Sequence, residues 1–141
     1  MKLVKAMRWI APVIALGRPG EAIGVGRILA NEESWRAAIT SLIDRATIVF
    51  CIPSAHEGTR WEIAHIIERF HLHKTIFVMP PKSVFFGRAN ELEDDWAKLA
   101  KEMREQGYLF PLYQAAGLLF VIDASNKSIT RQPFQSQIRS L

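Results

Sequence analysis

Residues 47–63 read TIVFCIPSAHEGTRWEI, which is an apolar run, a polar loop and the beginning of a helical pattern. The first six residues are apolar or β-branched without alternation, which is typical of a parallel strand covered on both faces. Similar runs occur at 13–16, 75–79 and 118–122. We therefore expect each run to be a strand of one mostly parallel sheet.

Helical periodicity fills most of the space between these runs. Apolar residues recur every three or four positions in the segments 35–46, 63–70 and 92–103. Alternating strands and helices predict a three-layer α/β fold with four or five strands, helices on both faces and right-handed crossovers. The last strand is expected at 129–134, at the edge of the sheet, because Pro133 lacks the N–H that a central strand would use.

Length and composition favour a single α/β domain over residues 1–141. Of the 141 residues 49% are hydrophobic and 23% are charged, which allows one core and excludes a disordered chain. Residues 1–11 are interpreted as a truncated or flexible lead-in, and residues 135–141 as a frayed end. The formal net charge is +4, and its scattered basic residues favour a small anionic ligand over nucleic acid.

The same sequence indicates a cytoplasmic location. The single cysteine, Cys51, has no partner for an intrachain disulfide and is interpreted as a buried thiol in a reducing compartment. No apolar run approaches the roughly 20 residues that span a bilayer. Arg8 and Pro12 interrupt the apolar part of the first residues, which argues against a secretory signal.

The loop after the first predicted strand is the first candidate ligand site. It contains Gly17, Arg18 and Gly20, and Arg27 follows. Glycines let backbone amides approach a ligand, and arginines pair with phosphate. The spacing matches no established phosphate-binding motif. Two interpretations therefore stay open, a phosphate-binding loop and a glycine-rich turn with solvated arginines.

The loop after the second predicted strand is the other candidate. Ser54 and His56 are placed to contact a ribose or phosphate, and Gly58 and Thr59 open a helix. Glu62 follows Thr59 by three residues, the spacing of a capping box, in which it would only satisfy a backbone N–H. The same carboxylate at the floor of a cleft would stabilise an electron-poor sugar carbon. Both interpretations stay open.

The residues also lead to expectations about metal binding and about self-association. The histidines and carboxylates show no zinc-ligand spacing, so no metal site is expected. A self-association surface is expected from a group of apolar residues in the second half of the chain, namely Phe85, Phe86, Leu109, Phe110 and Leu112.

Several motifs together resemble a known family. They are Gly-Arg-Pro-Gly-Glu (17–21), Gly-x-Gly-Arg (24–27), Trp35, Gly-Thr-Arg-Trp-Glu-Ile (58–63) and Val-Met-Pro-Pro (78–81). Their order over roughly residues 12–123 resembles a bacterial TIR-like (Toll/interleukin-1 receptor-like) domain, related to nucleoside deoxyribosyltransferase-like folds. Domains of this kind are found at the carboxyl end of bacterial membrane proteins of unknown role. The resemblance implies a flavodoxin-like sheet and a bacterial cytoplasmic domain, with a membrane tether through flanking sequence as one possibility.

The resemblance also implies an activity. It places Glu62 at the position of the catalytic glutamate of TIR-type NAD glycohydrolases, which cleave the nicotinamide–ribose N-glycosidic bond. The substrate would be NAD or a related nucleotide, and no cofactor would be required. Residues matched to the first loop and to the pocket wall are Gly17, Arg18, Gly20, Ser54 and Trp61. The alternative is a non-catalytic module that senses nucleotides or self-associates. The chain is one strand–helix unit shorter than a full TIR domain, because residues 20–31 are expected to form a loop.

Overall fold

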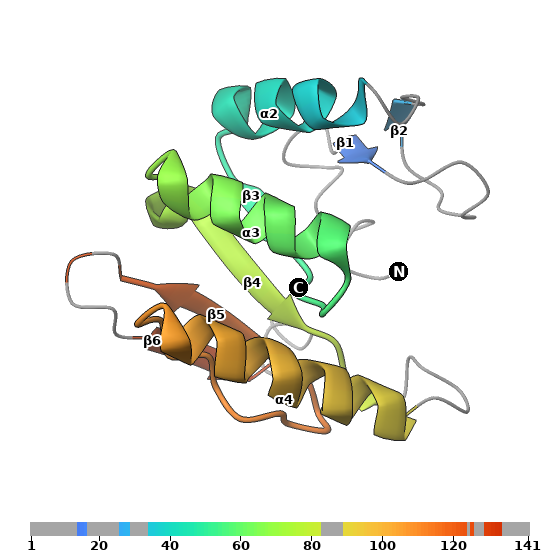
Figure 1. Ribbon diagram of the computed structural model, residues 1–141, viewed down its shortest axis with the longest axis vertical. Helices are drawn as coiled ribbons and strands as arrows, with labels where there is room; N and C mark the ends of the chain where they lie inside the picture. Colours follow the sequence, from blue (N-terminus) through green and yellow to red (C-terminus); the bar gives the residue numbers. More distant parts are fainter. Residues whose placement is uncertain are drawn as a thin grey trace. The chain divides into compact units, whose positions relative to one another are not determined.

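The apolar run 47–52 contributes strand β3 to a four-stranded sheet (Figure 1). The computed structural model describes residues 14–16, 26–28, 34–82, 89–123, 125 and 129–133. The strands of this sheet, in the order β3-β4-β5-β6, are Val49–Cys51, Thr75–Met79, Leu118–Ile122 and Ile129–Pro133. β3 and β4 are parallel, whereas β4–β5 and β5–β6 are antiparallel. The protein is thus a mixed α/β fold with an open mixed sheet, and β6 is the predicted edge strand.

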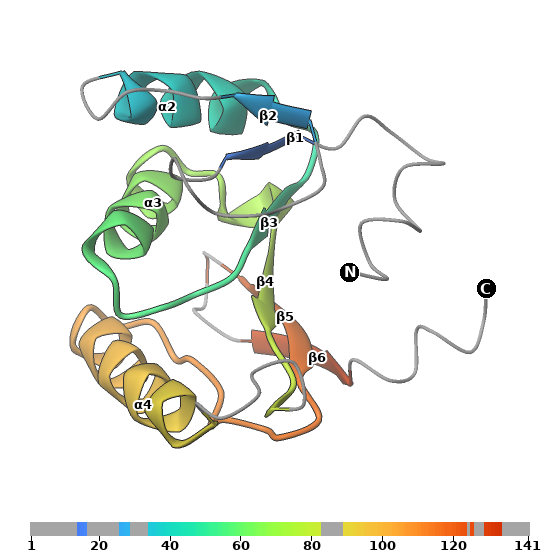
Figure 2. The ribbon, with the colours of Figure 1, turned by 90° about the vertical axis from the view of Figure 1, so that its right-hand side faces the viewer.

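Two α-helices cover this sheet on the same face. α3 is Glu57–Glu68 and α4 is Ala89–Glu105, and both lie on one side of the strands in two perpendicular views (Figure 1 and Figure 2). A short 3-10 helix, η1 at Leu72–Lys74, precedes β4. Among the described residues of 43–141, the helices therefore form one layer, and the predicted covering of both faces is not observed there. The helix residues buried against the sheet include Ile63, Ile66, Trp96, Leu99 and Met103.

The direction of β5 differs from the predicted parallel arrangement because the connector after α4 reverses the chain. Residues 106–117 return to the carboxyl end of β4, where the Lys82 N–H donates a hydrogen bond of 2.9 Å to the Ala115 carbonyl. Leu118, the first residue of β5, then pairs with Met79, the last residue of β4. A strand that starts at this edge must run antiparallel to β4. The helical crossover expected between the two strands is thereby replaced by a helix followed by a return segment.

A cluster of aromatic rings, some stacked and some edge to face, lies between α4 and the sheet. The ring centroids of Phe77 and Phe120 lie 5.3 Å apart, and Phe110 contacts Phe120 at the same centroid distance with a 75° interplanar angle. Phe110 is only 5% exposed. Its predicted place on an exposed self-association surface is therefore wrong, because it belongs to the core. Leu109 and Leu112, at 52% and 79% exposure, remain at the surface.

The chain divides into two compact units, residues 1–42 and residues 43–141, and each is described by itself. In the first unit, β1 (Ile14–Leu16) pairs in parallel with β2 (Gly26–Ile28). β2 lies inside the segment 20–31, so the prediction of a loop throughout that segment is wrong.

The remaining helix, α2, spans Trp35–Arg45, so its last turn belongs to the second unit. The predicted lead-in at 1–11 and the predicted frayed end at 135–141 lie outside the described residues, as do Phe85 and Phe86. No helix within the described ranges combines the length and apolar character that crossing a membrane requires.

Candidate functional site

The carboxyl end of β3 leads directly into the loop that carries most of the predicted site residues. β3 ends at Cys51, residues 52–56 form the loop, and α3 begins at Glu57. Because β4 is parallel to β3, its last residue, Met79, lies toward the same edge of the sheet. Cys51 and Pro53 are buried, so the loop is anchored in the core at its start.

A hydrogen bond between two predicted site residues closes this loop. The Ser54 hydroxyl donates to the Thr59 hydroxyl over 3.0 Å, and both residues are half-buried. Thr59 lies in the first turn of α3, so the bond holds the loop against the amino terminus of the helix. The first backbone N–H groups of a helix lack intrahelical acceptors and favour negative charge. The two hydroxyls and the helix terminus together form a polar edge beside the end of β3.

α3 begins earlier than a capping box at Thr59 requires. The residue before the helix is His56, with φ −68° and ψ 142°, and its carbonyl accepts a 3.0 Å hydrogen bond from the Arg60 N–H. Thr59 is therefore the third residue of the helix, and the interpretation of Glu62 as the partner of an N-cap threonine is wrong. The His56 side chain is exposed and makes no capping hydrogen bond within the described part of the chain. Gly58 lies in the first turn of α3.

Glu62 is half-buried and acts electrostatically on Cys51. Burial raises the pKa of the Cys51 thiol well above its usual range, and the negative charge of Glu62 raises this pKa further. Glu62 lies in the second turn of α3, the helix that follows β3 after the short loop 52–56. From the sequence, Cys51 is expected only as a buried core residue. Its place as the last residue of a strand, directly before the candidate loop, is the signal that indicates a neighbour of the site.

Trp61 packs along its own helix. Its ring is stacked on that of His65, with centroids 5.1 Å apart and an interplanar angle of 14°. The His65 Nε2 atom is buried and has no hydrogen-bond partner among the described residues. One face of the Trp61 ring is therefore occupied by the imidazole. The place of Trp61 in a pocket wall, which the resemblance implies, stays a prediction.

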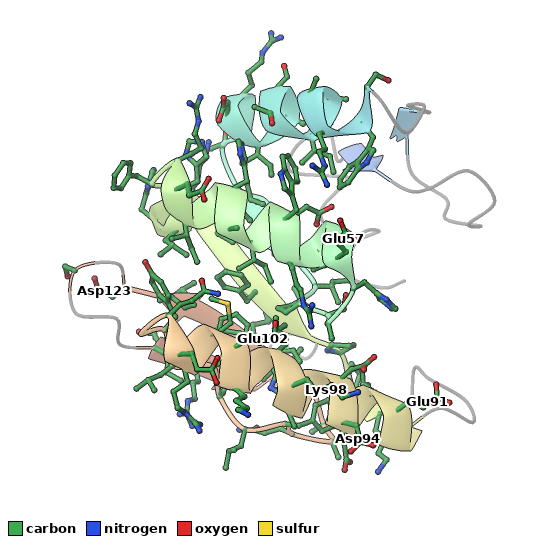
Figure 3. All side chains as sticks on the ribbon, in the orientation of Figure 1. Glu57, Glu91, Asp94, Lys98, Glu102 and Asp123 are labelled. Atoms are coloured by element: carbon green, nitrogen blue, oxygen red, sulfur yellow. The ribbon has the colours of Figure 1, made fainter. Side chains whose placement is uncertain are left out.

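Arg60 links the candidate site to α4, a contact that the sequence does not reveal. Its guanidinium lies 2.6 Å from the Glu102 carboxylate, and both side chains are substantially exposed. Figure 3 shows Glu102 on the side of α4 that faces α3. An exposed ion pair adds little stability, but it defines where Arg60 lies beside the first turn of α3.

The glycine-rich loop is not joined to this site by the structure. Gly17, Arg18 and Gly20 lie outside the described residues, and Arg27 lies in β2 with its side chain likewise outside them. All four belong to the unit of residues 1–42, whereas Glu62 belongs to the other unit. A hollow shared by Glu62 and this loop remains a prediction.

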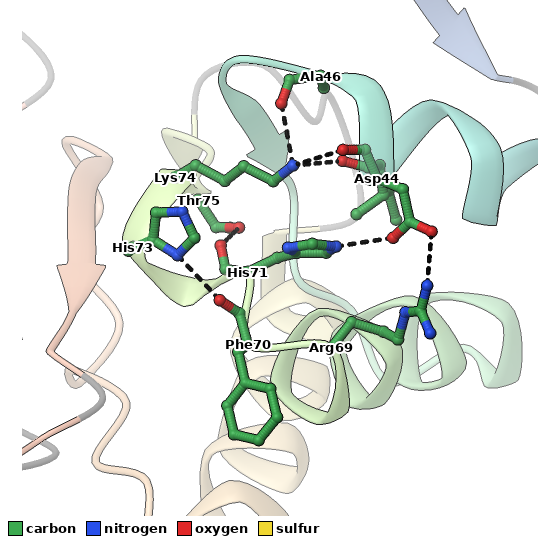
Figure 4. A network of polar contacts seen from close by, with 9 residues as sticks. Asp44, Ala46, Arg69, Phe70, His71, His73, Lys74 and Thr75 are labelled. Carbon is green, nitrogen blue, oxygen red and sulfur yellow. Dashed lines mark hydrogen bonds and ion pairs between the residues drawn. The ribbon is translucent and has the colours of Figure 1, made fainter.

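A second polar cluster lies at the far end of α3 (Figure 4). The Asp44 carboxylate contacts His71 Nε2 at 2.7 Å and the Arg69 guanidinium at 2.8 Å. These contacts lower the pKa of Asp44 from 3.8 to about 2; the hydrogen bond with His71 has the largest effect, and the one with Arg69 the next largest. The Lys74 ammonium donates to the last carbonyls of α2, Ile43 O at 2.7 Å among them. The cluster joins the ends of two helices, and we assign it a structural role.

Comparisons of the chain with models of known protein families, with curated proteins and with solved structures gave no match. The TIR-like resemblance therefore rests on the motifs alone. Among the described residues, no three histidine, cysteine, aspartate or glutamate side chains gather so as to hold a metal ion.

Proposed function

We propose that this chain is a nucleotide-binding α/β domain in which Glu62 promotes cleavage of an N-glycosidic bond, with NAD as the substrate. One observation carries the proposal: Glu62 is half-buried on α3, the helix that directly follows β3, and its charge acts on Cys51, the last residue of that strand. Ligands of open α/β sheets bind outside the carboxyl ends of the strands. The order of the TIR-like motifs supports the proposal, whereas the antiparallel β5 departs from the sheet that this resemblance implies.

In the proposed reaction, the bond between the nicotinamide nitrogen and ribose C1 breaks, and nicotinamide leaves with both bonding electrons. Positive charge then develops on the ribose ring, and the Glu62 carboxylate stabilises it. Water adds to C1 and loses a proton, which gives ADP-ribose, nicotinamide and a proton. This chemistry requires no metal and no further cofactor.

The neighbouring residues would bind and orient the nucleotide. The Ser54 and Thr59 hydroxyls, 3.0 Å apart, are suited to hydrogen-bond a ribose that displaces their mutual contact. Exposed His56 and the backbone amides at the start of α3 are suited to a phosphate. Binding of the pyrophosphate by Gly17, Arg18, Gly20 and Arg27, which the resemblance implies, stays a prediction.

The test is nicotinamide release from NAD by the purified protein, followed over a wide range of protein concentration. Glu62→Gln keeps the size of the side chain and removes its charge, so turnover is expected to fall by at least about 100-fold while the far-UV circular dichroism is unchanged. Glu68→Gln is the matched control, because Glu68 lies on the same helix and is exposed. We expect it to retain full activity. Wild-type protein that releases no nicotinamide at any concentration would refute the enzymatic proposal.

A module that binds nucleotides without reacting them is the second candidate. It would use the same Ser54 and Thr59 hydroxyls at the start of α3, and it does not require Glu62 to act on the bound nucleotide. Ligands that bind only the native state raise the melting temperature. A higher melting temperature with NAD or ADP-ribose, combined with no release of nicotinamide, would therefore favour sensing over catalysis.

A further inference from the structure

A groove on the outer side of α4 stands apart from the candidate site. It has a volume of about 230 Å³, several times the roughly 30 Å³ that one water molecule occupies in the liquid. Its lining residues come from α4 and from the connector that follows, and they are Glu93, Trp96, Ala97, Ala100, Lys101, Arg104, Leu112 and Tyr113. The groove is therefore mainly apolar and has room for an aliphatic side chain.

The groove is preformed, because hydrogen bonds fix the connector against the core. The Trp96 Nε1–H donates to the Pro111 carbonyl over 2.8 Å, and the Tyr113 hydroxyl donates to the Pro80 carbonyl over 3.1 Å. Between these two anchors, the Leu112 side chain is 79% exposed. The large apolar side chain of Leu112 thus projects at the rim of an apolar groove. The same surface therefore carries both a protruding residue and a groove that could accept such a residue from another molecule.

Charge along this face of α4 changes sign from one end to the other. Glu93 and Asp94 lie toward the amino end, and Lys101 and Arg104 lie toward the carboxyl end, with small Ala97 between them. Figure 3 shows Asp94 on the side of α4 that points away from α3. Glu93 pairs with Lys82 at 2.8 Å. In the described part of the chain, the structure gives no ion pair to Asp94, Lys101 or Arg104.

We propose that this face of α4 is a twofold-symmetric dimer interface between two copies of this chain. In an antiparallel pair of α4 helices, an axis crossing between Ala97 and Lys98 brings Asp94 of each copy to Lys101 of the other. The same operation brings the acidic end of each groove to the basic end of the other, and Leu112 of each copy enters the partner's groove. In an isologous interface, the same patch of both copies must be complementary to itself, and this face of α4 meets that requirement.

The expected dimer is weak. α4 has 17 residues, which corresponds to a length of about 25 Å at the usual rise per residue. Two such helices with their connectors reach only the lower end of the size range for specific interfaces. The dissociation constant is therefore expected in the micromolar range, rising with ionic strength because the contacts at its rim are charged.

The first experiment measures molecular mass against concentration by sedimentation for the full chain. The wild type is expected to pass from one chain to two as concentration rises. Leu112→Asp is expected to raise the dissociation constant by at least about tenfold, since it places two carboxylates in the apolar grooves. Leu109→Asp is the matched control, because Leu109 is exposed on the same connector but does not line the groove. We expect it to dimerise like the wild type.

The second experiment swaps charges across the proposed axis. Asp94→Lys and Lys101→Glu each place like charges opposite one another in both symmetric contacts, so each variant alone is expected to be monomeric. An equimolar mixture restores opposite charges in both contacts and is expected to recover the dimer, which misfolded variants would not do. Glu68→Lys is the charge control, because Glu68 is exposed on α3 and lies outside the proposed interface; this variant should still dimerise.

Three results would overturn the proposal: a wild type that stays monomeric at every concentration, a dimer that survives Leu112→Asp, or charge variants that fail to associate on mixing. A monomeric wild type would leave the groove to a different occupant, such as an acidic peptide. None of these readouts uses nicotinamide release, so the dimer and the proposed enzymatic activity succeed or fail separately.

Discussion

At the scale of single residues, Phe70 combines a bulky side chain with a backbone conformation that usually requires glycine. It follows α3 with φ 60°, and its N–H and that of His71 bond to the carbonyls of Ile67 and Ile66 in the manner of a Schellman motif. Glycine usually occupies this position, because other residues pay about 1–2 kcal/mol in the left-handed conformation. The helical periodicity predicts Phe70 on the buried stripe, yet its side chain is 82% exposed. The helix ends before the residue reaches the sheet.

Phe70→Gly is therefore expected to stabilise the protein. Relief of the backbone strain is partly offset by the larger entropy of glycine in the unfolded chain, which leaves a net gain of about 0.5–1 kcal/mol in the free energy of unfolding. Urea denaturation measures it. Phe70→Ala is the control, because it removes the ring and keeps the Cβ atom that causes the strain. If both variants are equally stable, the left-handed conformation does not occur in solution.

At the scale of elements, the ends of α2 and α3 are joined through Asp44, which contacts His71 and Arg69. These partners lower the pKa of Asp44 from 3.8 to about 2 in the folded chain, so the unfolded chain binds the proton more readily. The stabilisation is therefore present above pH 3.8 and is lost as the pH falls toward 2. Asp44→Asn lacks this titration. We expect the stability difference between wild type and Asp44→Asn, measured with urea, to shrink across that interval.

Removing one of the two partners provides the comparison for this pH dependence. In Arg69→Gln the hydrogen bond with His71 remains, so the pKa of Asp44 is expected to move only part of the way back toward its ordinary value. The same loss of stability should then begin at the same pH, which the unfolded chain sets, but be complete at a higher pH and so span a narrower interval. A wild type and an Asp44→Asn variant with parallel stability profiles below pH 4 would show that the network does not form.

At the scale of the whole molecule, the positions of strands can be predicted from local sequence patterns. The direction of a strand cannot, because it depends on contacts between residues far apart in the sequence. The strands 75–79 and 118–122 match the structure because each is a continuous apolar run. The sequence does not predict β2, because its three residues, beginning at Gly26, include no such run. The direction of β5 depends on how the connector 106–117 folds back, and hydrophobic periodicity carries no information about that.

At the candidate site, too, features that are local in the sequence differ from contacts between distant residues. The sequence predicts that Ser54, Thr59 and Glu62 lie near one another, because they are close in sequence where a strand is followed by a helix. That they form a ligand site stays a prediction. The contact between Arg60 and Glu102 joins residues 42 positions apart. This contact depends on how α3 and α4 pack against each other, so no sequence motif predicts it.

The antiparallel sheet depends on Gly117, where the connector enters β5. Its φ is 79°, and a Cβ atom there would lie 2.9 Å from both the Met79 carbonyl oxygen and the Pro81 nitrogen. Both are backbone atoms of the segment at the end of β4, so neither can move aside as a flexible side chain would. Gly117→Ala is therefore expected to lower the free energy of unfolding by about 2–4 kcal/mol, from left-handed strain and overpacking together. Gly107→Ala is the matched control, because Gly107 also has a positive φ, 86°, but is exposed at the end of α4. It should cost only about 1–2 kcal/mol. Equal losses in urea denaturation would mean that the connector does not approach β4 this closely, and the reversal of β5 would then need another cause.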